Sequence, residues 1–152
     1  MIMKYTYLFF ISLLFISCSN DEASKDKMSN DMEIQEYLKQ NNLAATKTNS
    51  GLYYLIEREG SGTKPTSNNS VRVAYKGYFA NKSVFDQSPA AGISFPLNGV
   101  IKGWTEGITY FKVGGKGKLF IPSSLGYGNN SYQGIPGGSV LIFDIELLEI
   151  TK

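Results

Sequence analysis

Three patterns of apolar and polar residues follow one another along this chain of 152 residues. A mostly apolar run comes first, at residues 8–16, interrupted only by Ser12. Residues 18–30 are mostly polar and charged without apolar periodicity, and they predict a flexible tether because they offer too little apolar surface to bury. From residue 51 onward the chain is dense in β-branched and aromatic residues, which predicts one globular domain over residues 51–152.

Between the tether and the domain, the sequence predicts a short amphipathic helix followed by a connector over residues 31–50. Apolar side chains recur at helical spacing over residues 31–42, and Asn30 with Glu33 has the spacing of a capping box. The apolar stripe is narrow and consists of Ile34, Tyr37 and Leu38. Such a helix can dock on the domain, pair with another copy of the chain or fray, and docking is the interpretation we favour.

Within the domain, the pattern predicts strands and one helix. Segments rich in β-branched and aromatic residues predict strands at 52–59, 71–79, 117–122 and 139–150. The second of these alternates, with Val71 and Val73 on one face. Trp104, Ile108 and Phe111 repeat at spacings of four and three residues, which predicts a short helix. Together these elements predict an α+β fold, an antiparallel sheet curled around one short helix.

The composition removes several classes of chemistry. The chain has no histidine and one cysteine, so nucleophilic triads with an imidazole base, the commonest zinc sites and dithiol redox centres are excluded. With 15 Lys and Arg against 13 Asp and Glu, the net charge is +2 and no basic stripe is present, so we expect no nucleic-acid partner. The protein is therefore expected to work without a metal or a redox centre.

The apolar run near the start has the features of an export signal. Lys4 precedes the run, which is too short to span a bilayer comfortably, and Ser17 and Cys18 follow it. This ending resembles a bacterial lipobox, although Phe15 stands where that motif usually has Leu, Val or Ile. The resemblance implies removal of residues 1–17 as a lipoprotein signal peptide, lipidation of Cys18 and a membrane-anchored protein of the bacterial cell envelope. The alternatives are an uncleaved membrane anchor or a plain signal peptide with an incidental cysteine.

Six sequence blocks in order resemble the signature of one family, the FKBP-type peptidyl-prolyl cis-trans isomerases. The blocks are YKGYF at 75–79, VFDQS at 84–88, VIKGWTEG at 100–107, GYG at 126–128, GIPGGS at 134–139 and LIFDIELLEI at 141–150. One block would be weak support, but six with matching order and spacing are specific. The resemblance implies a half-barrel of antiparallel strands wrapped over a short helix, with a proline-binding pocket between them.

The resemblance also assigns roles to individual residues. Catalytic roles are implied for Tyr75, Phe85, Asp86, Trp104 and Tyr127, with the indole of Trp104 as the floor on which the pyrrolidine ring packs. Substrate-binding roles are implied for Ile93, Phe95, Val100, Ile101, Tyr132, Ile135 and Phe143. The backbone N–H of Ile101 and the hydroxyl of Tyr127 would donate to substrate carbonyls, while Asp86 would orient Tyr75 or bind substrate. The plainer interpretation is that these aromatic residues are core, which for Phe143 has nearly equal weight, and that Asp86 is a solvated turn residue.

Three departures from the family pattern bear on this site. The stretch between Asp86 and Phe95 lacks the basic partner that many members have for this aspartate. Ile93 stands where some members have an aromatic wall residue. Gly137 replaces the second proline of the usual loop tip, which predicts a more mobile loop over residues 129–139. These changes leave substrate preference, turnover and the binding of macrolide inhibitors open.

The implied activity is the acceleration of X-Pro isomerisation in exported protein clients, which breaks no bond and needs no cofactor. A proline-peptide-binding module or holdase chaperone with little turnover is the main alternative. A third possibility is a structural partner that docks through the helix at 31–42.

Overall fold

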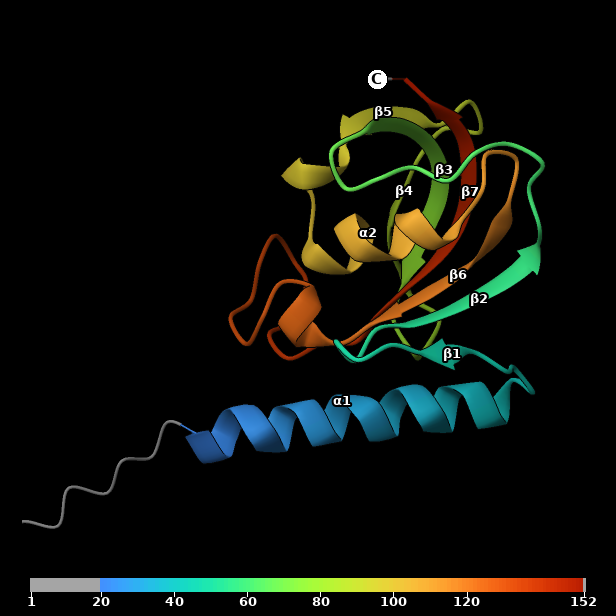
Figure 1. Cartoon of the computed structure of the whole chain (residues 1–152). Coiled ribbons are helices and arrows are strands. Elements are labelled where there is room, and N and C mark those ends of the chain that lie inside the picture. Colours follow the sequence, from blue (N-terminus) through green and yellow to red (C-terminus); the bar gives the residue numbers. More distant parts are fainter. Residues whose placement is uncertain (1–19, 152) are drawn as a thin grey trace, which may run out of the picture.

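The computed structural model describes residues 20–151, and the apolar run at 8–16 and Cys18 lie outside these described residues. A curved antiparallel sheet forms the centre of the fold, with a helix on each side of it (Figure 1). The strands are β1 (Thr46–Lys47), β2 (Tyr53–Arg58), β3 (Ser70–Tyr78), β4 (Val84–Gln87), β5 (Ile93–Pro96), β6 (Lys116–Ile121) and β7 (Leu141–Ile150). The helices are α1 (Asn20–Gln40) and α2 (Lys102–Gly107), with short 3-10 turns η1 (Leu97–Gly99), η2 (Ile108–Tyr110) and η3 (Ser123–Leu125).

The sheet order is β1-β2-β6-β7-β3-β4, and β5 also pairs with β3. The first half of β3 pairs with β5 and its second half with β4, so these two short strands continue the same edge of the sheet one after the other. The predicted α+β fold is confirmed, and the four predicted strands are present as β2, β3, β6 and β7. The strands that the sequence did not predict are two to four residues long, too short to show an alternation.

Alternating side chains give the sheet two apolar faces. Along β6, Leu119 and Ile121 point to the face that packs on α2, and Phe120 points to the opposite face. The same alternation in β7 sends Phe143 toward α2 and Ile142 away from it. Helix α2 packs on the first face and α1 on the second, so the two helices lie on opposite sides of the sheet, as Figure 1 also shows.

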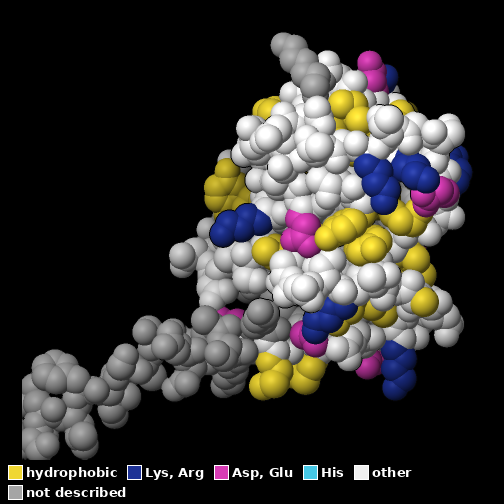
Figure 2. Space-filling view, in the orientation of Figure 1, with side chains coloured by type: hydrophobic (Ala, Val, Ile, Leu, Met, Phe, Trp, Pro, Cys, Tyr) yellow, Lys and Arg dark blue, Asp and Glu magenta, His cyan; other side chains and the backbone are white. Residues whose placement is uncertain are grey.

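Helix α1 docks on the outer face of the sheet, as predicted. Ile34, Tyr37 and Leu38 are each less than a tenth exposed, and the Tyr37 ring lies 5.9 Å from that of Phe120. The apolar stripe of the helix is therefore covered by the domain itself, which removes it as a docking surface for another protein. Hydrophobic side chains do remain on the surface at the lower edge of Figure 2, where α1 lies, and Met28 and Met32 are 63% and 59% exposed.

Two predictions about this segment are wrong. Helix α1 starts at Asn20, so residues 20–30 are helical and not a flexible tether. Acidic residues at its start and lysines about four residues further on favour a helix even without apolar periodicity. Asn30 is also not a capping residue, because it lies inside the helix and its side chain bonds to the domain. No helix within residues 20–151 is both long enough and apolar enough to cross a bilayer.

Candidate active site

A pocket of about 750 Å³ opens between α2, the sheet and the loop that follows η3. All twelve residues that the sequence assigned to a proline-binding site line it: Tyr75, Phe85, Asp86, Ile93, Phe95, Val100, Ile101, Trp104, Tyr127, Tyr132, Ile135 and Phe143. Two further lining residues, Gly99 and Gln133, were not predicted. The size and the aromatic lining suit a small apolar group carried on a peptide.

The floor of the pocket is Trp104, which α2 presents to the sheet. The helix can approach the sheet closely because Gly103 and Gly107 face β6, where an added Cβ would lie 2.5 Å from Ile121 and 2.7 Å from Leu119. Trp104 is 5% exposed, and its buried indole N–H has no hydrogen-bond partner in the described part of the protein. The indole is therefore fixed by packing alone and leaves one flat apolar surface toward the pocket.

Aromatic rings from three strands hold this indole in place. The rings of Tyr75 and Phe143 meet it edge-on, with centroids 4.9 Å and 5.1 Å away, and the ring of Phe95 lies at 5.2 Å. Phe85 in turn packs edge-on against Phe143 at 5.5 Å. Edge-to-face contacts of this kind stabilise a fixed arrangement of rings. Phe143 is 4% exposed and lines the pocket, so it serves both as core and as wall.

Tyr75 and Asp86 form a hydrogen-bonded pair at the rim of the pocket. The Tyr75 hydroxyl donates to the Asp86 carboxylate over 2.6 Å, from β3 to the adjacent β4. Burial and this carboxylate raise the pKa of Tyr75 well above its ordinary value, so the hydroxyl remains a donor at any pH of interest. None of the ion pairs within residues 20–151 includes Asp86, so this hydroxyl is the contact that orients it.

The mouth of the pocket is formed by the loop between η3 and β7. The rings of Tyr127 and Tyr132 stack with centroids 4.8 Å apart and an interplanar angle of 12°. Tyr132 and Ile135 exchange two backbone hydrogen bonds around a tight turn, in which Gln133 has a φ of 45°. This turn explains why Gln133 reaches the pocket. Burial and the neighbouring Tyr132 raise the pKa of Tyr127, so its hydroxyl also stays protonated and able to donate.

The same loop closes on itself at Gly137. A Cβ at this position would lie 2.0 Å from the carbonyl oxygen of Asn129, so only glycine fits where the two arms of the loop meet. The mobility predicted for residues 129–139 stays a prediction.

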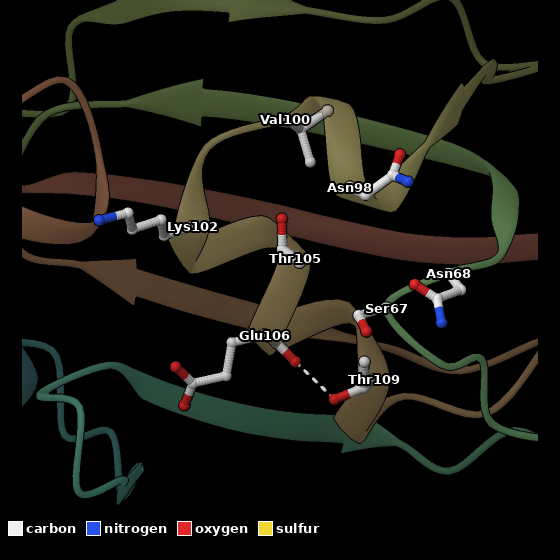
Figure 3. A pocket seen from close by; sticks show the side chains of 8 residues that line it. All are labelled: Ser67, Asn68, Asn98, Val100, Lys102, Thr105, Glu106 and Thr109. Carbon is white, nitrogen blue, oxygen red and sulfur yellow. Dashed lines mark hydrogen bonds between the residues drawn. The ribbon is translucent and has the colours of Figure 1, made fainter.

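A second hollow lies beside the pocket and shares Val100 with it (Figure 3). Its other lining residues are Ser67, Asn68, Asn98, Lys102, Thr105, Glu106 and Thr109. The hydroxyls of Thr105 and Thr109 already donate hydrogen bonds to backbone carbonyls, that of Thr105 to Leu97 and that of Thr109 to Glu106. Most side chains that line this hollow are polar and none is aromatic, so of the two only the aromatic pocket has the character of a site for an apolar ring. Within residues 20–151, no group of acidic residues is arranged to hold a metal ion.

The fold and the pocket together have the size, shape and lining that suit a small apolar ring. Comparison with known families makes the assignment specific, because the family model described as FKBP-type peptidyl-prolyl cis-trans isomerase matches residues 61–148. This is more than half of the chain, which therefore belongs to the FKBP-type peptidyl-prolyl cis-trans isomerase family. The resemblance found in the six sequence blocks is confirmed.

Individual relatives agree with this assignment. The chain is 43% identical over 135 residues to the FKBP-type peptidyl-prolyl cis-trans isomerase FkpA of Aeromonas hydrophila, which covers 86% of this chain and 50% of that protein. It is 42% identical over 120 residues to an FKBP-type 22 kDa peptidyl-prolyl cis-trans isomerase of Escherichia coli, covering 76% and 58%. The chain thus spans about half the length of the curated relatives it matches.

Two solved structures match most of the chain. The crystal structure of FkpA from Escherichia coli gives a TM-score of 0.72 at 38% identity and covers 86% of this chain and 63% of that one. A peptidyl-prolyl cis-trans isomerase from Pseudomonas syringae gives a TM-score of 0.74 at 27% identity, covering 90% and 99%.

Proposed function

We propose that this protein is a peptidyl-prolyl cis-trans isomerase that accelerates X-Pro isomerisation in protein clients. The observation that carries the proposal is the pocket floored by Trp104, with the Tyr75–Asp86 pair at its rim. The indole offers a flat surface to a pyrrolidine ring, and the surrounding aromatic rings exclude water from it.

The chemistry needs only this pocket and a few donors. Rotation about an X-Pro amide has a barrier of about 18–20 kcal/mol, because the partial double bond must be broken. A site that holds the proline ring and removes water from the amide favours the twisted form, which has less charge separation than either planar form. The backbone N–H of Ile101 would donate to the carbonyl after the proline, and the Tyr127 hydroxyl to the carbonyl of the rotating amide.

The test is turnover of a short Leu-Pro-Phe peptide by the purified full chain and by Trp104→Leu. We expect acceleration by the wild-type protein and its loss in the variant. Thr109→Ala serves as the control, because Thr109 lines the neighbouring polar hollow and not the aromatic pocket. Equal turnover by the wild-type protein and Trp104→Leu would show that the reaction does not use this pocket.

A binding module with little turnover is the second candidate, and the mouth of the pocket favours it. Ile93, Tyr127 and Tyr132 are 41%, 38% and 48% exposed, so apolar surface is available to an unfolded chain beyond the proline itself. Peptide binding that quenches Trp104 fluorescence without acceleration of isomerisation would establish this function in place of catalysis. The same titration with a macrolide inhibitor of the family tests whether that class of ligand enters the pocket.

We further infer that the protein acts in the bacterial cell envelope and is anchored there by a lipid on Cys18. The apolar run, the small residue before the cysteine and the single thiol in the chain support this. Mass spectrometry of the protein from membranes should find diacylglycerol on Cys18 as the new N-terminus. Recovery of the unmodified chain with residues 1–17 attached would contradict the anchor.

A further inference from the structure

Two polar residues are buried in the part of the chain that the structure describes, and they bond to each other. Asn30 and Ser123 are each 4% exposed. The side-chain oxygen of Asn30 accepts a hydrogen bond from the Ser123 backbone N–H over 2.7 Å. The side-chain nitrogen of Asn30 donates to the Gly138 carbonyl over 2.9 Å. Both polar atoms of the Asn30 side chain are therefore paired with backbone groups of the domain. Asn30 itself lies on α1, 93 and 108 residues away from these two partners in the sequence.

These two backbone groups lie at the two ends of the loop that forms the mouth of the pocket. The loop runs from Ser123 to Gly138 and carries Tyr127, Tyr132 and Ile135. Its ends also bond through Gly128, whose N–H donates to Ser123 and whose carbonyl accepts from Gly138. Asn30 thus spans the base of the loop as a bridge between its two arms.

The position of Asn30 on α1 gives the bridge a rigid support. Asp26, Asn30, Ile34 and Leu38 follow at spacings of four residues, so they lie along one side of the helix. The apolar half of this side is buried against the sheet, and the polar half faces the loop. Asp26 adds a second contact there, because its carboxylate accepts a hydrogen bond from the Asn129 side chain.

We propose that Asn30 is a positioning residue for the active site, which holds the loop so that Tyr127 and Ile135 stand over the bound proline. The proposal rests on the proposed function, because it gives α1 a role in the same pocket. Asn30 touches no substrate. It acts by fixing the separation of Ser123 and Gly138, and the sheet fixes Asn30 through α1.

An amide is the side chain that suits this position. A leucine of similar size would fill the space but leave the buried Ser123 N–H and the partly buried Gly138 carbonyl without their side-chain partner, which is costly, most of all for the N–H. Asn30→Leu therefore separates the two roles that Asn30 has, namely filling space and pairing backbone groups. Asn30→Ala is a milder change, because it removes both bonds but leaves a space in which water can pair with the two backbone groups.

Amide hydrogen exchange on the purified full chain tests the proposal directly. We expect exchange at Gly128, Ile135 and Gly138 to rise about tenfold in Asn30→Leu, as the loss of one buried hydrogen-bonded pair implies. Exchange in β6 and β7 should stay unchanged. Gln40→Ala is the matched control, because Gln40 is an exposed amide on the same helix that bonds only to Glu36. Its loop exchange should equal that of the wild-type protein.

Peptide affinity, measured by Trp104 fluorescence, distinguishes a positioning role from a purely structural one. A residue that only stabilised the fold would not change this affinity. We expect the KM or Kd for a Leu-Pro-Phe peptide to rise several-fold in Asn30→Leu and less in Asn30→Ala, with the melting temperature of Asn30→Ala above that of Asn30→Leu. Loop exchange and peptide affinity equal to those of Gln40→Ala would overturn the proposal, and so would a uniform rise of exchange over the whole sheet. If Asn30→Leu does not fold, Asn30→Ala decides by the same two measurements.

The proposed function can fail separately from this inference. A wild-type protein that binds peptide without isomerising it would refute the enzyme, while exchange and binding would still report on Asn30.

Discussion

Removing the Tyr75 hydroxyl tests the assignment of the pocket most sharply. Tyr75→Phe keeps the ring that meets Trp104 edge-on at 4.9 Å and deletes only the donor to Asp86 at 2.6 Å. The Asp86 carboxylate then loses the contact that orients it at the rim of the pocket. The change therefore isolates one hydrogen bond between two side chains that both line the site.

The size of the effect follows from the nature of this bond. Hydrogen bonds to charged groups contribute about 1.5–3 kcal/mol, and the lower end applies here because Asp86 is exposed to water. If the oriented carboxylate acts in the transition state, kcat/KM should fall roughly tenfold for each 1.4 kcal/mol lost. Stability should change little, because the ring contacts with Trp104 and Phe143 remain.

A double-mutant cycle with Asp86→Ala on a Leu-Pro-Phe peptide is the assay. Tyr75→Phe and the double variant should have about the same kcat/KM as Asp86→Ala, because each of the three lacks the same contact. Tyr78→Phe is the matched control: it lies on the same strand and loses a hydrogen bond to Asp144 on the opposite side of the sheet. Fully additive losses for Tyr75 and Asp86, or an equal loss in Tyr78→Phe, would refute the reasoning.

Three further predictions concern the pocket wall, the docked helix and acid. Gly77→Ala should weaken peptide binding in a Trp104 fluorescence titration, because the new Cβ would lie 2.7 Å from the Phe85 ring; unchanged affinity would mean that the ring yields freely. Ile34→Ala should lower the free energy of unfolding in urea by about 2–5 kcal/mol, since this 1% exposed side chain joins α1 to the sheet, and a loss below that range would show weak docking. The hydrogen bond from Lys47 lowers the pKa of Asp31, so its stabilising contribution is present above the unfolded pKa of about 3.9 and is lost as the pH falls through the lower folded value. The difference in urea midpoint between the wild-type protein and Asp31→Asn should accordingly shrink as the pH is lowered from 6 to about 2, and a constant difference would contradict it.

The sheet could be predicted where its strands alternate and not where they are short. In β3, burial alternates as the sequence pattern predicts: Val71 and Val73 are fully buried, and Arg72 between them is partly exposed. β4 and β5 are four residues each and pair only with β3, so their partners and not their own pattern make them strands. Local sequence does not contain that information.

The sequence predicted the site residues whose side chains carry the family resemblance, and it missed two residues that reach the pocket through the shape of the backbone. The family resemblance placed all twelve predicted residues in one pocket, nine of them within the six blocks, whereas Gly99 and Gln133 line it because of the turns in which they lie. A positive φ in a non-glycine residue such as Gln133 has no clear mark in the sequence. Asn30 was misassigned for a similar reason, because its spacing to Glu33 fits a cap while its partners lie 93 and 108 residues away.

The order of contacts along α1 has a mechanical consequence. A pull on the chain at Asn20 would load the helix from its N-terminal end, so the bonds of Asp26 and Asn30 to the pocket loop would bear the force before the apolar contacts of Ile34 and Leu38. The helix would peel from the loop first and from the sheet afterwards. Tension would thus reach the mouth of the pocket while the sheet and the Trp104 floor were still intact, which makes the loop the part of the site that a pull on the chain would disturb first.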